Sequence, residues 1–181
     1  MTNNMQSCSE ELYFYSIKHH NYLFMNKKIL KEIENLPFIR NKKMIDNTDT
    51  SVKALQVYNN DIESPTISLL KKWILTIVDD EWITHKISSY WLAKYSKGDY
   101  TISHHHIPAS YAFIYFIRSP IGSSPLVFST SDTIIEPEEG KLIIFPGNLF
   151  HHVPKNECDG RIVFSGNIWE KRLDFFNTEK E

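Results

Sequence analysis

The chain has 181 residues, which is enough for one domain with a sizeable hydrophobic core. Its 20 basic and 22 acidic residues give a net charge of -2, so nothing in the charge balance points to a nucleic-acid partner. No apolar run approaches the ~20 residues that span a bilayer, and the polar N-terminus does not resemble a signal peptide. We therefore expect a cytoplasmic protein without a membrane partner.

Two helices are predicted in the first half of the chain. Apolar residues repeat at helical spacing over residues 25–36, with Asn26 as the expected N-cap. A second apolar stripe predicts a helix over residues 65–82, where Ser64 provides the N-cap and a proline follows in the first turn.

The pattern changes to short β-rich runs in the second half of the chain. Turn signals separate these runs, which is typical of an antiparallel sandwich or barrel and not of alternating βαβ units. The predicted strands cover residues 90–95, 111–117, 126–128, 133–135, 141–145 and 161–169.

These elements predict a mainly β protein with N-terminal α-helices. The expected architecture is a double-stranded β-helix, a jelly roll of the cupin-like kind, backed by the helices. Residues 1–181 form a single domain in this interpretation. Residues 1–89 are a helical N-terminal support region, residues 90–169 are the β-helix core, and residues 170–181 are a C-terminal tail.

The eight histidines are the informative feature of the composition, because five of them fall into two tight groups. His104 and His106 are two residues apart, so they point to the same side of a strand, whereas His105 points away. His151 follows a later strand and turn, and would complete a three-point metal site with open positions. Imidazole suits iron, zinc, copper and nickel, so the ligand type does not select the metal. His19 is expected at the surface.

Arg161 is the candidate anchor for an acidic ligand. A hairpin at the turn over residues 156–160 would pair His151 with Ser165 and bring the guanidinium within reach of a small dicarboxylate at the metal. The hydroxyl of Tyr115, in the strand after the first histidines, is a candidate donor to the same carboxylate. A surface arginine and a core tyrosine are the ordinary alternatives.

The same stretches resemble a known enzyme family. His104-His-His106 with the strand that follows, then Phe145-Pro-Gly-Asn-Leu-Phe-His151 and finally Arg161, are similar to motifs of the iron(II)- and 2-oxoglutarate-dependent oxygenases. The small prolyl-hydroxylase-like group is the most similar. The resemblance covers residues 90–169, and no motif matches in the N-terminal half.

The resemblance implies a non-haem dioxygenase that uses iron(II), with 2-oxoglutarate and dioxygen as cosubstrates. Its implied site residues are the metal ligands His104, His106 and His151, and the cosubstrate-binding residues Arg161, Tyr115 and Ser165. His106 stands where most members of the superfamily have an aspartate or glutamate. The primary substrate is unknown; the family suggests peptidyl proline or another protein side chain.

Two alternatives remain open from the sequence. The spacing of Gly98, the first histidines, Gly140, Pro146 and His151 also looks like a cupin, with a glutamate of that pattern missing. A three-histidine cupin would be a metal dioxygenase or isomerase that does not use 2-oxoglutarate. The other alternative is a non-catalytic jelly-roll binding module.

Overall fold

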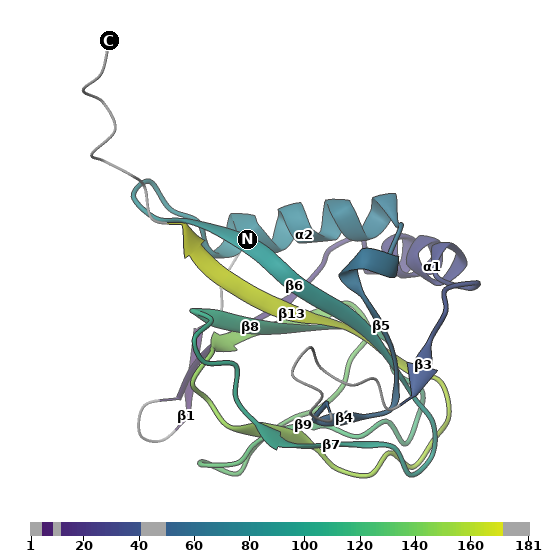
Figure 1. Cartoon of the computed structure of the whole chain (residues 1–181). Helices are drawn as coiled ribbons and strands as arrows, with labels where there is room; N and C mark the ends of the chain where they lie inside the picture. The colour runs from purple at the N-terminus through teal and green to yellow at the C-terminus, as the bar shows by residue number, and fades with distance from the viewer. Residues whose placement is uncertain (1–4, 9–11, 41–49, 172–181) are drawn as a thin grey trace.

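Two antiparallel sheets face each other, and two helices cover the outer face of the larger sheet (Figure 1). The structure is a computed structural model, and it describes residues 5–8, 12–40 and 50–171. The larger sheet has eight strands in the order β1-β2-β11-β8-β13-β6-β5-β3, and the smaller has five in the order β10-β9-β12-β7-β4. This arrangement confirms the predicted mainly β jelly roll backed by helices.

The strands of the larger sheet, in spatial order, are β1 (Met5–Cys8), β2 (Leu12–Lys18), β11 (Lys141–Pro146), β8 (Tyr111–Arg118), β13 (Arg161–Lys171), β6 (Thr84–Tyr95), β5 (Leu55–Tyr58) and β3 (Ile39–Arg40). The strands of the smaller sheet are β10 (Thr133–Ile135), β9 (Leu126–Phe128), β12 (His151–Val153), β7 (Tyr100–His104) and β4 (Val52–Lys53). The helices are α1 (Tyr22–Glu32), the 3-10 turn η1 (Asn59–Asp61) and α2 (Pro65–Val78).

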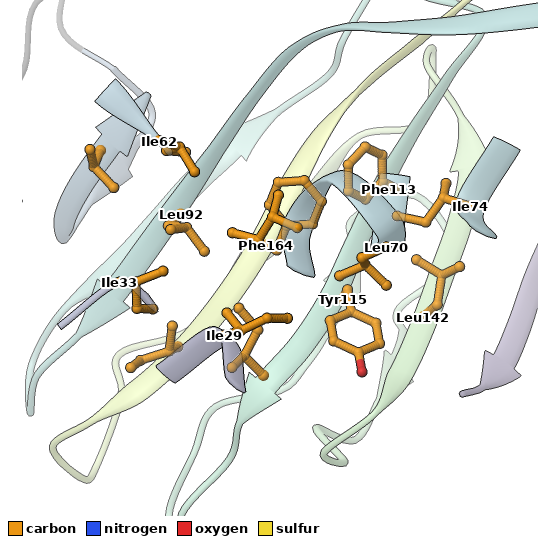
Figure 2. Close-up of a cluster of buried hydrophobic side chains, with 14 of the residues drawn as sticks. Ile29, Ile33, Ile62, Leu70, Ile74, Leu92, Phe113, Tyr115, Leu142 and Phe164 are labelled. Carbon is orange, nitrogen blue, oxygen red and sulfur yellow. The ribbon is translucent and has the colours of Figure 1, made fainter. Parts of the chain in front are cut away.

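Alternate residues of the central strand β8 point to two different cores. Phe113 and Tyr115 belong to the cluster beneath the helices, where they pack with Ile29 of α1 and Leu70 of α2 (Figure 2). Successive side chains of a strand point to opposite faces, so a strand in this layer is buried on both sides. Burial on both faces explains the nearly continuous apolar sequence of β8.

The other face of β8 contributes to the core between the two sheets. Ile114 and Phe116 pack there with Phe145 of β11 and with Phe128 and Val153 from the smaller sheet. The space between the sheets is therefore mostly filled by apolar side chains, and polar groups that enter it are exceptional.

Helix α2 begins where the sequence predicts and ends earlier. The Ser64 hydroxyl accepts a hydrogen bond from the backbone of Ile67 at 3.0 Å, which confirms the N-cap. The helix ends at Val78 because two aspartates follow, and negative charge is unfavourable at a helix C-terminus. Asp80 instead accepts hydrogen bonds from the backbone of the turn that leads into β6.

Helix α1 starts at Tyr22, so the predicted N-cap Asn26 is wrong. Asn26 is a buried residue on the sheet-facing side of the helix, and its amide donates to the carbonyl of Ile117 at 2.7 Å. A polar residue in this position satisfies a backbone carbonyl of β8 and fixes the helix against the sheet.

The N-terminal region is less helical than predicted. Strands β1 to β5 all lie before residue 60, and β2 pairs with β11 in the larger sheet. Strand β6 also begins at Thr84, so the β structure starts before residue 90. His19, expected at the surface, is 6% exposed and packs edge-on against Trp73. Among the described residues, no helix is both long enough and apolar enough to cross a membrane.

Candidate active site

Three histidines meet at one end of the space between the sheets. His104 ends β7 and His151 begins β12, and the two residues are direct partners in the antiparallel pairing of these strands. The candidate ligand nitrogens of His104, His106 and His151 all lie within 4.8 Å of one another. The structure therefore brings together all three of the histidines that the sequence predicts.

The rings of His104 and His151 are oriented so that Nε2 of each is available to bind a metal. The Nδ1 atom of His104 lies 2.8 Å from the carbonyl oxygen of Ile102, and Nδ1 of His151 lies 3.0 Å from that of Leu149. A carbonyl only accepts, so both Nδ1 atoms donate and both Nε2 atoms have a free lone pair. A backbone carbonyl that accepts from one ring nitrogen commonly orients a metal-binding histidine.

The electrostatics keep these histidines neutral. Burial, together with the neighbouring rings of His151 and His104, lowers the pKa of His106 to about 2. Burial and the His104 ring lower the pKa of His151 to about 3, and burial lowers that of His104 as well. Metal binding requires the neutral imidazole, so the site holds its ligands in the competent form.

The spacing of the nitrogens also fits a metal ion. The Nε2 atoms of His106 and His151 are 3.3 Å apart. Two nitrogens that share a metal at bonds of about 2.1 Å lie roughly 3.0 to 3.4 Å apart. The donor set and this distance are consistent with a first-row divalent metal such as iron(II).

Gly147 positions the turn that leads into His151. A side chain at this position would place its Cβ 2.1 Å from the carbonyl oxygen of Ala109, so only glycine fits the contact. The carbonyl of Gly147 accepts a hydrogen bond from the backbone of His106 at 2.7 Å. This close approach locks the segment that holds His106 against the segment that delivers His151.

Arg161 lies in the same interior. It is 0% exposed, and none of its three side-chain nitrogens makes a well-formed hydrogen bond among the described residues, where its nearest polar neighbour is the side chain of Tyr95. Burial lowers the pKa of its guanidinium, because the interior disfavours the charged form. The guanidinium carbon lies 4.5 Å from the centroid of the Tyr95 ring, a cation–π contact.

An inner pocket extends from the histidines toward this arginine. Its walls include the three histidines, Tyr95, Thr101 and Ser165. Tyr95 connects the two parts of the site, because its ring lines the pocket and also covers the guanidinium of Arg161. A buried guanidinium that shares Tyr95 with the pocket of the three histidines fits the carboxylate of a small acid.

Comparison of the sequence with protein-family models finds no match, and neither does comparison with curated proteins. Solved structures do match. A viral collagen prolyl hydroxylase from Paramecium bursaria chlorella virus-1, in a 2-oxoglutarate complex, is 17% identical with a TM-score of 0.65, over 86% of this chain and 94% of that one. A prolyl hydroxylase from Trichoplax adhaerens, in complex with a hypoxia-inducible-factor peptide, is 16% identical with a TM-score of 0.66, over 85% and 82%.

A third similar structure is HygX from Streptomyces hygroscopicus with nickel, 2-oxoglutarate and hygromycin B bound. It is 10% identical with a TM-score of 0.64, over 86% of this chain and 82% of that one. The chain has the fold of the 2-oxoglutarate oxygenases. Identities this low establish the fold, and the oxygenase fold is the one that the motifs suggested.

Ser165, the third residue that the resemblance assigns to the cosubstrate, also lies at the inner pocket. Ser165 is buried, lines the inner pocket and shares a face of β13 with Arg161. It reaches this position by another route than predicted, since β12 and β13 form no hairpin. Strand β12 pairs with β7 and β9 in the smaller sheet, while β13 pairs with β6 and β8 in the larger one. The turn over residues 156–160 therefore connects the smaller sheet to the larger one.

Tyr115 is not part of this pocket, and its predicted role beside the carboxylate is wrong for this structure. Its side chain points to the helices, beside Ile29 and Leu70 (Figure 2). Its hydroxyl donates to Oδ1 of Asn26 at 2.8 Å. Tyr95, which was not among the predicted site residues, is the tyrosine that adjoins Arg161. No local pattern in the sequence marks it, because Tyr95 meets Arg161 through the pairing of β6 with β13.

Proposed function

We propose that this protein is a non-haem iron(II)- and 2-oxoglutarate-dependent dioxygenase that hydroxylates a substrate. The buried guanidinium of Arg161, which shares Tyr95 with the pocket of the three histidines, carries this proposal. Bound iron(II) would supply the oxidising chemistry, with dioxygen as the second cosubstrate and with succinate and carbon dioxide as products of 2-oxoglutarate.

The residues of this chain have separate roles in that reaction. His104, His106 and His151 would hold the metal through neutral imidazole nitrogens. Arg161 would bind the distal carboxylate of 2-oxoglutarate, with Ser165 on the same wall of the pocket. The apolar core between the sheets would exclude water from the reacting end of the cosubstrate.

The cupin-like alternative has the same metal ligands and makes no use of Arg161. A charged group without a partner in the interior costs several kcal/mol, so its presence favours a function that supplies an acidic ligand. A binding module without a metal gives no reason for three neutral histidines with converging nitrogens.

Anaerobic titration of the protein with iron(II) and 2-oxoglutarate tests the proposal. We expect a weak visible absorption band that requires both components and disappears in Arg161→Met. The control is Arg118→Met, which removes an exposed arginine from the neighbouring strand β8. Metal binding without any response to 2-oxoglutarate would support the cupin-like alternative, and no metal binding would leave the binding module.

A further inference from the structure

A second hollow opens beside the histidines. This groove has a volume of about 320 Å³, and its walls include His104 and His106. It also shares Trp91 with the inner pocket, so a molecule in the groove lies next to the metal site. Its size is at the lower end of the range for small-molecule sites.

No lysine, arginine, aspartate or glutamate is among the described residues that line the groove, although three histidines are. When 2-oxoglutarate is bound, its two negative charges offset the two positive charges of a divalent metal beside the groove. A charged substrate group would then lose its water and find no acid, lysine or arginine of opposite charge on the described wall. The wall therefore selects a group that is uncharged.

Two amide side chains at the groove have unused hydrogen-bonding atoms. Gln56 is 1% exposed, and neither atom of its amide makes a well-formed hydrogen bond in the described part of the chain, where its nearest polar neighbour is the Tyr58 hydroxyl. Asn167 donates from Nδ2 to the Ser89 hydroxyl at 2.8 Å, while its Oδ1 faces the His106 ring without a well-formed hydrogen bond among the described residues. Buried polar groups are nearly always hydrogen-bonded, so these atoms can accept a polar partner that enters the groove.

The geometry of the strands places these amides around one opening. Gln56 lies on β5, opposite Ala93 of β6, and Asn167 lies on β13, opposite Ser89 of β6. The Trp91 ring stacks on His106 at 5.9 Å between ring centroids, which provides an apolar wall beside the amides. A donor and an acceptor from Gln56, an additional acceptor from Asn167 and a flat aromatic surface match the features of an amide group.

We infer that this groove binds the substrate through an uncharged amide, with Gln56 and Asn167 as specificity-determining residues. This inference rests on the proposed oxygenase function, because it assigns the groove to the substrate of that site. The inference depends on the charge and the hydrogen-bonding groups of the groove wall, which favour an amide over an acid or an amine.

Three small probes that differ in charge test the inference. They are N-acetylglycinamide, which is neutral, N-acetylglycine, which is an anion, and glycinamide, which is a cation. The full-length protein is loaded with Zn²⁺ and 2-oxoglutarate to prevent turnover, and binding is followed through the side-chain amide NMR signals of Gln56 and Asn167. We expect the neutral probe to shift both signals and to bind about fivefold more tightly than either charged probe.

Variants of Gln56 provide the second part of the test. Gln56→Glu keeps the shape and adds a negative charge, so it should reverse the preference toward glycinamide. The control Asn60→Asp adds the same charge at an exposed position and should change nothing. If burial of the glutamate prevents folding, Gln56→Met should weaken the neutral probe by about fivefold, with the Zn²⁺ and 2-oxoglutarate affinities unchanged.

The outcomes separate this inference from the proposed function. If Zn²⁺ and 2-oxoglutarate bind while the three probes bind equally, or leave both amide signals unmoved, the amide inference is wrong and the oxygenase proposal stands. If Zn²⁺ fails to bind, or 2-oxoglutarate fails to bind the Zn²⁺-loaded protein, the proposed function itself is overturned.

Discussion

Replacing Arg161 with methionine should improve stability and abolish cosubstrate binding at the same time. The buried guanidinium makes no well-formed hydrogen bond among the described residues, and a buried ion without a partner costs several kcal/mol. Its contact with the Tyr95 ring, at 4.5 Å, returns up to about 2 kcal/mol of that cost. We therefore expect the methionine variant without 2-oxoglutarate to be more stable by about 2 kcal/mol.

Thermal unfolding of the Zn²⁺-loaded protein measures both effects. A gain of about 2 kcal/mol corresponds to a rise in Tm of roughly 4 to 8 °C for a chain of this size. Saturation with 2-oxoglutarate at about 100 times its Kd should stabilise the wild type by about 2.7 kcal/mol and leave Arg161→Met unchanged. Arg118→Met, on the exposed end of β8, should keep the full response to 2-oxoglutarate.

Either of two results would contradict the predicted effects of Arg161→Met. A lower Tm for Arg161→Met without 2-oxoglutarate would show that the guanidinium has stabilising partners in the fold. An undiminished response of this variant to 2-oxoglutarate would show that the acid binds elsewhere.

Other substitutions test separate parts of the structure. His106→Asp should increase the affinity for Zn²⁺ in the absence of 2-oxoglutarate. In the wild type 2-oxoglutarate should raise the Zn²⁺ affinity, and in this variant that increase should be about tenfold smaller, as measured by calorimetric titration. Gly166→Ala would place a Cβ 2.7 Å from a ring carbon of Phe113, so urea unfolding should show a loss of about 1 to 3 kcal/mol. Tyr115→Phe removes the hydrogen bond to Asn26; it should cost about 1 kcal/mol in the same assay without changing 2-oxoglutarate binding.

The sequence predicted the metal cluster because its information is local. His104 and His106 are two residues apart, and although β7 ends at His104, their rings lie 4.9 Å apart between centroids. The residues Phe-Pro-Gly mark the turn that precedes His151. The pairing of β7 with β12 brings His151 opposite His104. This pairing follows once a jelly-roll architecture is predicted. The predicted ligand set therefore depended on short-range patterns that tertiary contacts did not override.

The errors concern information that the sequence does not hold locally. Tyr115 was assigned to the wrong face because β8 is apolar on both faces, so alternation gives no direction. Asparagine is a residue type that often caps a helix, but Asn26 instead donates a hydrogen bond to the Ile117 carbonyl of β8, which is far away in sequence. The false hairpin between His151 and Ser165 came from a turn that connects two different sheets.

The charges of the buried site explain why metal and cosubstrate should bind as a pair. Three neutral imidazoles leave both charges of a divalent metal uncompensated, and Arg161 adds one more positive charge nearby. No described aspartate or glutamate lines the inner pocket. Opposite charges about 4 Å apart attract by about 4 kcal/mol at an effective dielectric constant near 20, so a dianion such as 2-oxoglutarate has two strong partners. Each ligand should therefore raise the affinity of the other by the same factor, because thermodynamic coupling is reciprocal. A carboxylate in place of His106 would neutralise one charge within the protein, which is why His106→Asp weakens the coupling without removing the anchor at Arg161.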